Sequence, residues 1–380
     1  MNGTSYENCT FRVRRQVLAQ LADQALPAVP TRGSLAVYEC FRVTVRPGLL
    51  QLAATDSQLT VLASTRAVVT GDTAQVFVPA RRLKAILSEA PEGDVTFAVS
   101  GNMAKVTAGK PFWDVRLPPP RNYPELIAPE ALTFAKVSRT ALLEALQTVR
   151  HAASKDASRP QFAQVRIAKD GEAVFAVAHD GSQTCRAPVP GFPFETTVPA
   201  AMLDHLVKLL TGTKDEEVEV GEEDTSLAVR AAYTVLACQQ ATAPFPKVDS
   251  LVLEPTAAYQ VQLSADRDEL AAAVRRVSIS AQETTSAMAL IAEAGQVTVV
   301  TRDDDGNRAE EVIAASWPGG RRVITVNHKH LAAMLRVHPA AVCAFRLGED
   351  KGQRRSMLRL DHDSGGVSVI PQLQPSAVGL

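Results

Sequence analysis

A threefold internal repeat constrains the fold of this chain more than any other feature of its sequence. The segment VFVPARRLKAIL at residues 76–87 recurs as TTVPAAMLDHLV at 196–207 and as ITVNHKHLAAML at 324–335. Each copy has a short β-branched stretch, then a turn or N-cap residue, then apolar residues at helical spacing. The pattern predicts three copies of one strand-and-helix unit.

Three further sets of matched segments recur with nearly the same period. They are a turn aspartate between two alternating strands, an arginine three residues before a leucine at the start of a helix, and a closing segment centred on proline. The members are Asp56, Asp180 and Asp303; Arg15, Arg139 and Arg267; and residues 123–126, 245–248 and 370–373.

Four anchors with one period predict three copies of an α+β domain of about 125 residues each. The boundaries are expected near Ala128 and Pro255, which gives domains at 1–127, 128–255 and 256–380. Within each copy the expected order is strand, helix and several strands, followed by strand, helix and several strands again. Each domain is therefore itself a doubled unit.

Composition limits the class of protein. An apolar fraction of 46% and a charged fraction of 21% exclude a disordered or fibrous chain. No apolar stretch is long enough for a membrane span or a signal peptide, so a soluble, cytoplasmic protein without membrane contact is expected. The five cysteines include no CxxC pair, which favours neither a disulfide framework nor a zinc site.

The distribution of charge is more informative than its total. The formal net charge is −1, which argues against a simple basic patch. The six expected helices, however, have a summed formal charge of +9, and the rest of the chain has −10. Their ranges are 11–26, 80–90, 138–155, 200–214, 265–277 and 327–338. A fold with all helices on one surface would attract phosphates without reading bases, although lysine and arginine also commonly occupy solvent-facing helix positions.

No catalytic site is predicted. The chain has no GxGxxG after a strand and no phosphate-loop pattern, so nucleotide binding is not expected. We interpret His328-Lys329-His330 as solvent-facing basic residues, His179-Asp180 as part of a structural turn, and residues 303–306 as a hairpin turn without calcium-loop spacing. No cofactor or metal is expected.

Together these segments resemble the bacterial DNA polymerase III beta subunit, the sliding clamp, over nearly the whole chain. The most specific matches are the threefold repeat, the turn at Thr55-Asp56, the segment VPARRLKAI, the PEGD turn at residues 91–94 and NYPEL at residues 122–126. The resemblance implies an α+β DNA clamp fold of three repeated domains. It also implies a head-to-tail homodimer, a ring in which helices line a central hole and sheets lie outside.

The resemblance further implies a non-catalytic processivity factor. Duplex DNA would pass through the hole without sequence preference, and the polymerase III catalytic subunit, the clamp loader and repair clients would dock through short peptide motifs. The residues expected to face DNA are Arg14, Arg81, Arg82, Lys84, Arg150, Lys155, Lys208, Arg275, Lys329 and Arg336.

Two further surfaces follow from the resemblance by motif position. The dimer interface would place Trp113 and Val115 of PFWDVRLP opposite Ser278 and Ile279 of RRVSIS. The client-peptide pocket would lie between the second and third domains. Its expected residues are Arg159, Pro160, Phe162, His179, Gly181, Thr184, Pro246, Leu251, Ile370 and Pro371.

The chain departs from the family pattern at this pocket. Ser182 and Thr184 stand where histidine and leucine are frequent, and the chain ends Ile370-Pro371-Gln372-Leu373-Gln374 and continues to Leu380 without the usual arginine. Ser278 likewise stands where the family tends to have an apolar residue. A diverged or secondary clamp that acts in inhibitor resistance or as a client decoy is therefore an alternative. An unrelated DNA-binding or scaffold protein is a third hypothesis.

Overall fold

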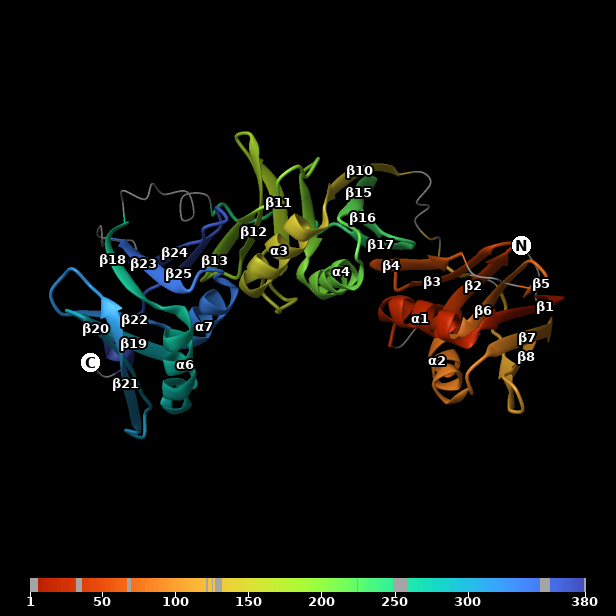
Figure 1. Cartoon of the computed structure of the whole chain (residues 1–380), viewed down its shortest axis with the longest axis horizontal. Coiled ribbons are helices and arrows are strands. Elements are labelled where there is room, and N and C mark those ends of the chain that lie inside the picture. Colours follow the sequence, from red (N-terminus) through yellow and green to blue (C-terminus); the bar gives the residue numbers. More distant parts are fainter. Residues whose placement is uncertain are drawn as a thin grey trace. The chain divides into compact units, whose positions relative to one another are not determined.

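The structure, a computed structural model, describes residues 6–31, 36–66, 70–120, 122–124, 126, 132–223, 225–248, 259–348 and 356–378. It contains two compact units. Figure 1 labels the helices and strands named below. Unit 1 consists of Met1–Arg139 and Asp204–Gln240, and unit 2 of Thr140–Leu203 and Ala241–Leu380.

The same order of elements occurs three times along the chain. The first third contains β1 (Tyr6–Arg14), α1 (Arg15–Ala25), β2 (Cys40–Arg46), β3 (Leu49–Thr55), β4 (Leu59–Thr65), β5 (Thr70–Gly71), β6 (Ala74–Pro79), α2 (Ala80–Glu89), β7 (Asp94–Gly101), β8 (Met103–Thr107) and β9 (Phe112–Arg116). The second contains β10 (Thr133–Ser138), α3 (Arg139–Val149), β11 (Gln164–Asp170), β12 (Ala173–His179), β13 (Thr184–Pro188), β14 (Thr196–Pro199), α4 (Ala200–Gly212), β15 (Glu217–Glu223), β16 (Ser226–Ala231) and β17 (Thr234–Gln239). The third contains β18 (Tyr259–Asp266), α6 (Arg267–Val277), β19 (Ala287–Glu293), β20 (Gln296–Arg302), β21 (Arg308–Ser316), β22 (Arg322–Asn327), α7 (His328–Val337), β23 (Val342–Gly348), β24 (Met357–Asp361) and β25 (Val367–Pro371).

The predicted order of strand, helix and strands, twice in each repeat, is therefore confirmed, as is the α+β class. The expected boundaries at Ala128 and Pro255 lie outside the described residues, and the division into three domains stays a prediction.

Unit 1 contains two antiparallel sheets. One has the strand order β5-β1-β7-β8-β9 and the other β10-β15-β16-β17-β4-β3-β2-β6. In the second sheet β17 pairs with β4, with Thr234 opposite Ala63 and Cys238 opposite Leu59. Because β17 and β4 come from different repeats, this pair joins two repeats into one continuous sheet.

Unit 2 contains a joint of the same kind. Its strand order is β14-β11-β12-β13-β25-β24-β23-β18-β21-β20-β19-β22, and β13 pairs with β25 through Thr184 opposite Val369. Within the third repeat, β21 pairs with β20 along its whole length. Its other edge pairs with β18 only at Ser316 and Ala315. Strand β9 ends the five-stranded sheet of unit 1.

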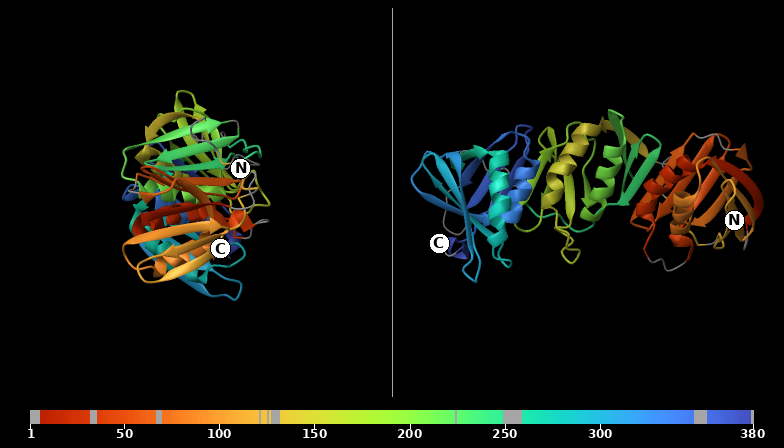
Figure 2. Two further views of the ribbon diagram at one scale, coloured as in Figure 1. Left: turned by 90° about the vertical axis from the view of Figure 1, so that its right-hand side faces the viewer. Right: turned by 60° about the horizontal axis from the view of Figure 1, so that its bottom comes forward.

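The helices pack their apolar faces on these sheets. In α1 the buried residues Leu18, Leu21, Ala22 and Ala25 follow helical spacing, and the helix packs beside α2 and over β3 and β4. In unit 2, α6 and α7 lie side by side (Figure 2). Their buried faces form the core of the third repeat with its strands.

All six expected helix ranges are longer than the observed helices, and the ranges 11–26 and 138–155 differ most. Residues 11–14 belong to β1, because Phe11 and Val13 alternate with exposed Arg12 and Arg14 and pair with β7. Helix α3 ends at Val149, followed by a 3₁₀ turn over Arg150–Ala152. With these bounds the six helices that the structure describes carry +5 rather than +9, since several cations flank the helices instead of lying within them.

Candidate functional site

The turn after β12 is held by its aspartate. Asp180 Oδ1 accepts hydrogen bonds from the backbone N–H groups of Ser182 and Gln183, at 2.8 and 2.9 Å. Asp56 makes the equivalent pair of contacts in the first repeat, and Asp303 accepts from the Asn307 N–H in the third. The predicted structural role of His179-Asp180 is thus confirmed for the aspartate.

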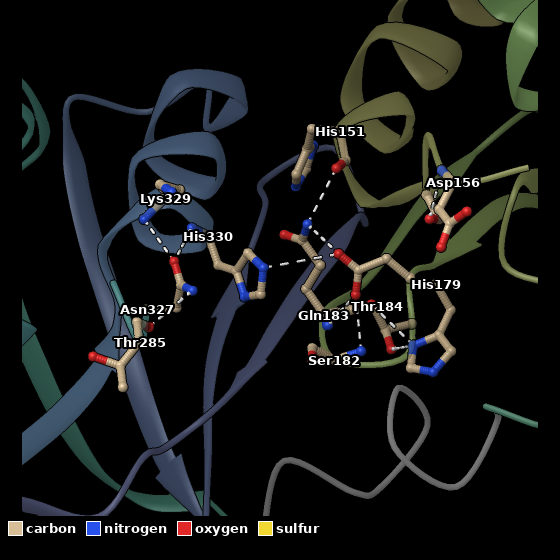
Figure 3. Close-up of polar contacts among 12 residues, drawn as sticks. His151, Asp156, His179, Ser182, Gln183, Thr184, Thr285, Asn327, Lys329 and His330 are labelled. Atoms are coloured by element: carbon tan, nitrogen blue, oxygen red, sulfur yellow. Dashed lines mark hydrogen bonds and ion pairs between the residues drawn. The ribbon is translucent and has the colours of Figure 1, made fainter. Parts of the chain in front are cut away.

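Gln183 and His330, both labelled in Figure 3, connect this turn to two helices through the second carboxylate oxygen of Asp180. Gln183 Nε2 donates to Asp180 Oδ2 at 2.8 Å and to the backbone oxygen of His151, just after α3, at 3.1 Å. His330 Nε2, in the first turn of α7, lies 3.8 Å from Asp180 Oδ2. The turn therefore links elements of the second and third repeats at the β13–β25 joint.

This contact corrects the prediction for His330. Its side chain is only 21% exposed, and burial lowers its pKa although Asp180 opposes the shift. Lys329 is exposed as predicted. The sequence pattern does not distinguish buried His330 from exposed Lys329, because the partner of His330, Asp180, is 150 residues away in the chain.

Arg159, Phe162 and His179 form a layered cluster beside the turn. The Arg159 guanidinium lies 4.4 Å from the centre of the Phe162 ring, and that ring meets His179 edge-on at 5.4 Å. His179 Nδ1 is 2.9 Å from both Gln183 O and Thr184 Oγ1. Burial lowers the pKa of His179, so the imidazole is neutral near pH 7.

Gly181 is required at its position. Its φ of +99° lies in the region that favours glycine, and a Cβ there would come within 2.7 Å of Arg159 Nη2. The same Cβ would lie 3.5 Å from the Phe162 ring. A glycine thus lets the turn approach the Arg159–Phe162 layer closely.

A small apolar cluster lies in the same unit. Val248, Val367 and Val369 are buried together, with Phe245 and Met357 packed against them, and Pro246 is half-buried next to Phe245. Pro160 is exposed and Pro371 half-buried, whereas Leu251 lies outside the described residues. The predicted pocket residues of the second repeat and the Pro246 segment thus belong to one unit.

Three predicted pocket residues are buried, and one of them is His179, whose exposure is 8%. Ile370 is 2% exposed because it belongs to the core of the third repeat. Thr184 is 1% exposed, and its hydroxyl contacts His179. The prediction missed Gln183 and His151, because neither residue belongs to a segment that recurs in the three repeats. It assigned Asp180 to the turn and omitted it from the pocket.

Of the predicted DNA-facing residues, nine are exposed: Arg14, Arg81, Arg82, Arg150, Lys155, Lys208, Arg275, Lys329 and Arg336. Lys84 is half-buried and forms an ion pair with Asp23. Lys155 follows the 3₁₀ turn after α3 and so lies outside a helix.

The predicted interface residues lie on the edge strand β9 and just after α6. Val115 is 0% exposed because it points into the core of unit 1, whereas Phe112, three residues earlier on the same strand, is 54% exposed. Trp113 and Ser278 are half-buried, and Ile279 is 86% exposed. Val312, on β21, is 55% exposed.

The described residues contain no cluster of three or more His, Cys, Asp or Glu side chains arranged to hold a metal ion. Within the same part of the chain, no helix combines the length and apolarity needed to cross a membrane.

Comparison with known sequences gives a consistent result. Residues 9–127 match the family model described as DNA polymerase III beta subunit, N-terminal domain. The beta sliding clamp of Micrococcus luteus is 25% identical over 313 residues, which cover 80% of this chain and 98% of that protein.

Solved structures share the fold. The sliding clamp of Pseudomonas aeruginosa, solved bound to griselimycin, matches with a TM-score of 0.88 at 18% identity, over 97% of this chain and all of that one. A C. crescentus beta sliding clamp gives the same TM-score at 20% identity, over 97% of this chain and 100% of the other. The predicted DNA clamp fold is confirmed.

Proposed function

We propose that this chain, a member of the DNA polymerase III beta-subunit family, is a DNA sliding clamp without catalytic activity. Two copies, each of three domains, form a head-to-tail ring that encircles duplex DNA in the cytoplasm. The ring tethers the replicative polymerase and other clients.

The continuation of sheets across repeats is the observation that carries this proposal. One joint pairs β4 with β17 and the next pairs β13 with β25. In the element order, β21 holds the place in the third repeat that β4 and β13 hold in the first and second, and β9 holds the place of β17 and β25. Strand β9 ends its sheet, and β21 pairs with β18 only at Ala315 and Ser316. A third joint of the same kind pairs β21 of one protomer with β9 of its partner, and twofold symmetry makes two such joints.

Exposed apolar side chains support this pairing. Phe112 on β9, Val312 on β21 and Ile279 beside β21 are 54%, 55% and 86% exposed. Unpaired edge strands with large apolar side chains tend to associate. A partner strand at each edge would supply the missing backbone hydrogen bonds and cover the exposed apolar side chains.

Exposed cations support the DNA contact. Arg81 and Arg82 on α2, Arg275 on α6, and Lys329 and Arg336 on α7 are all exposed. They offer phosphate contacts and no arrangement that would read bases, which suits a protein that moves along DNA.

The exposed Arg159 guanidinium over the half-buried Phe162 ring, with half-buried Phe245 and Pro246 in the same unit, supports client binding. An aromatic and apolar surface with one guanidinium suits short peptides that combine apolar side chains with an acidic group. We assign the polymerase catalytic subunit, the clamp loader and repair proteins to this surface.

The mass in solution and retention on DNA test the proposal. Light scattering across a dilution series should give twice 40.6 kDa. Protein loaded on nicked circular DNA should remain bound in high salt and be released when the circle is cut. A persistent monomer, or equal loss from circular and cut DNA, contradicts the clamp.

A second candidate is a clamp paralogue that acts in inhibitor resistance or as a client decoy. The C-terminal segment is the observation that favours this candidate. The Leu373 N–H donates to Thr325 O, and Val378 packs on the β19 face with Ala287 and Ile291. The tail after Pro371 thus turns onto a sheet face. Loss of client peptides with a retained ring favours the decoy, and retained peptides with weak griselimycin binding favour resistance.

A further inference from the structure

The two joints between repeats inside this chain have the same register. At the first joint Thr60 lies opposite Ala237, and at the second Thr184 lies opposite Val369. Thr60 and Thr184 hold equivalent positions, because each also lies opposite the last residue of the strand before its turn. A third joint built in the same way would therefore have a defined register as well.

The backbone ladders identify the equivalent residues on the two free edges. On β21 the counterpart of Thr60 and Thr184 is Arg308, which lies opposite the last residue of β20. On β9 the counterpart of Ala237 and Val369 is Asp114. It is reached across three ladders from the residue five positions before the recurrent arginine. The three series are Thr10–Ala98–Lys105–Asp114, Phe134–Gly221–Ala228–Ala237 and Gln262–Arg346–Arg359–Val369.

This register brings opposite charges together. Arg308 and Asp114 are both exposed, and their neighbours Ala309 and Val115 turn toward the cores. Residues directly opposite each other on one face of a sheet have Cβ atoms about 5 Å apart, and a pair of opposite charge stabilises the sheet. In one protomer Arg308 pairs only with exposed Glu310 on its own strand, a contact that contributes little.

The inner face fits the same register. It sets half-buried Trp113 opposite Ala309, which packs against the core of the third repeat. A large side chain thus meets a small one on the side that a joint would cover.

Neighbouring registers are less favourable. A shift by one residue would turn Arg308 to the inner face. A shift by two in one direction would set Arg308 opposite exposed Arg116. The same shift would set Glu310 opposite Asp114, so both pairs would have like charges. A shift by two in the other direction would set Arg308 opposite Phe112 and leave Asp114 without a cation across the joint.

We propose that the joint between protomers keeps the register of the two internal joints, so that Arg308 of one protomer pairs with Asp114 of the partner subunit. The pair presupposes the ring proposed above and specifies it further. Complementary charge at this position makes a second copy of this chain the fitting partner for both free edges.

Charge reversal on either strand tests the pair. Arg308→Asp and Asp114→Arg each put like charges at both joints of a ring made of one variant. Each should therefore raise the dissociation constant of the dimer about 30-fold, measured on the full chain by light scattering across a dilution series.

A mixture of the two variants gives the sharper test. In a mixed dimer one joint has the reversed pair and the other joint has the native pair, so the charges are complementary at both. Native mass spectrometry of an equal mixture should show the mixed dimer in excess over both homodimers. Its dissociation constant should lie within about threefold of the wild-type value.

Arg302→Asp is the matched control. Arg302 is exposed and lies directly opposite Arg308 on β20, one strand further from the edge. Its reversal should change the dissociation constant less than about threefold, and its mixture with Asp114→Arg should show no excess of mixed dimer. A wild-type dimer without preferential mixing of Arg308→Asp and Asp114→Arg overturns the pair and leaves the ring standing. A wild-type monomer contradicts the ring itself and the pair with it.

Discussion

The guanidinium of Arg267, the first residue of α6, donates from Nη1 to the backbone oxygen of His338 at 2.9 Å and so closes the C-terminal end of α7. Arg15 makes the same bond to Leu87 O at 2.9 Å, and Arg139 to Leu210 O at 3.2 Å. The arginine that recurs in the sequence thus satisfies a carbonyl at the end of the second helix of its own repeat, where the helix dipole favours a cation.

Replacement of Arg267 by methionine should lower the free energy of unfolding of the full chain more than Arg275→Met does, because the α7 carbonyl loses a charged donor. Urea denaturation measures the change. Arg275→Met removes an exposed cation of the same helix and should cost less than about 0.5 kcal/mol. Equal losses would contradict the helix-closing role.

Gly181→Ala should destabilise the chain by about 2 kcal/mol and weaken client-peptide binding, since alanine both strains a φ of +99° and displaces Arg159. Gly171→Ala is the matched control. Its φ is +63°, and a Cβ there meets no atom within 4 Å. Calorimetry and peptide titration should show the larger loss only at Gly181; peptide affinity equal to wild type would separate this turn from the client surface.

Stability should fall in mild acid. Burial lowers the pKa of His151 and of His362 to about 4, from an unfolded value near 6.5. Below pH 6.5 the unfolded chain binds more protons, so stability is complete above that pH and declines as pH falls toward 4. Each histidine contributes at most roughly 3 kcal/mol to the decline.

Urea denaturation between pH 7.5 and 4 measures this slope. His362→Gln should flatten it, as should His151→Gln. The neighbouring charges act in both directions, since His338 and Arg336 disfavour protonation while Asp180, Asp361 and Asp363 favour it. An unchanged slope in both variants would show that neither histidine is buried in solution as in this structure.

Val312→Asp should convert the proposed dimer to a monomer. A buried carboxylate at each of two symmetry-related joints should raise the dissociation constant by roughly 100-fold or more. Val342→Asp is the control, because Val342 is as exposed as Val312, at 54%, but is the first residue of β23. It does not belong to the stretch of β21 that lacks pairing with β18. Light scattering of the two variants should differ, and equal masses would remove β21 from the interface.

Much of the fold followed from local patterns. The apolar spacing of Leu83 and Leu87 placed α2 within one residue of its observed end, and the turn aspartates were assigned correctly. The start of α1 was misplaced because Arg12 to Arg15 suit an exposed strand as well as a helix, and only pairing with β7 decides between them.

The candidate site was harder to predict. Arg159, Phe162 and His179 were identified by motif, but Ile370 and Val115 were assigned to surfaces and lie in cores. Alternation along a strand gives two faces without saying which one is covered. The contact between His330 and Asp180 joins segments whose separation no local pattern spans.

The sequence by itself determined the repeat, the order of strands and helices, and the turns, because these depend on interactions among residues close in the chain. The tertiary structure decided which strands join successive repeats, in which register they pair and which histidines are buried. Those features depend on contacts between segments that are distant in the chain. Such contacts decide which side chains are buried, and burial in turn shifts the pKa of the histidines.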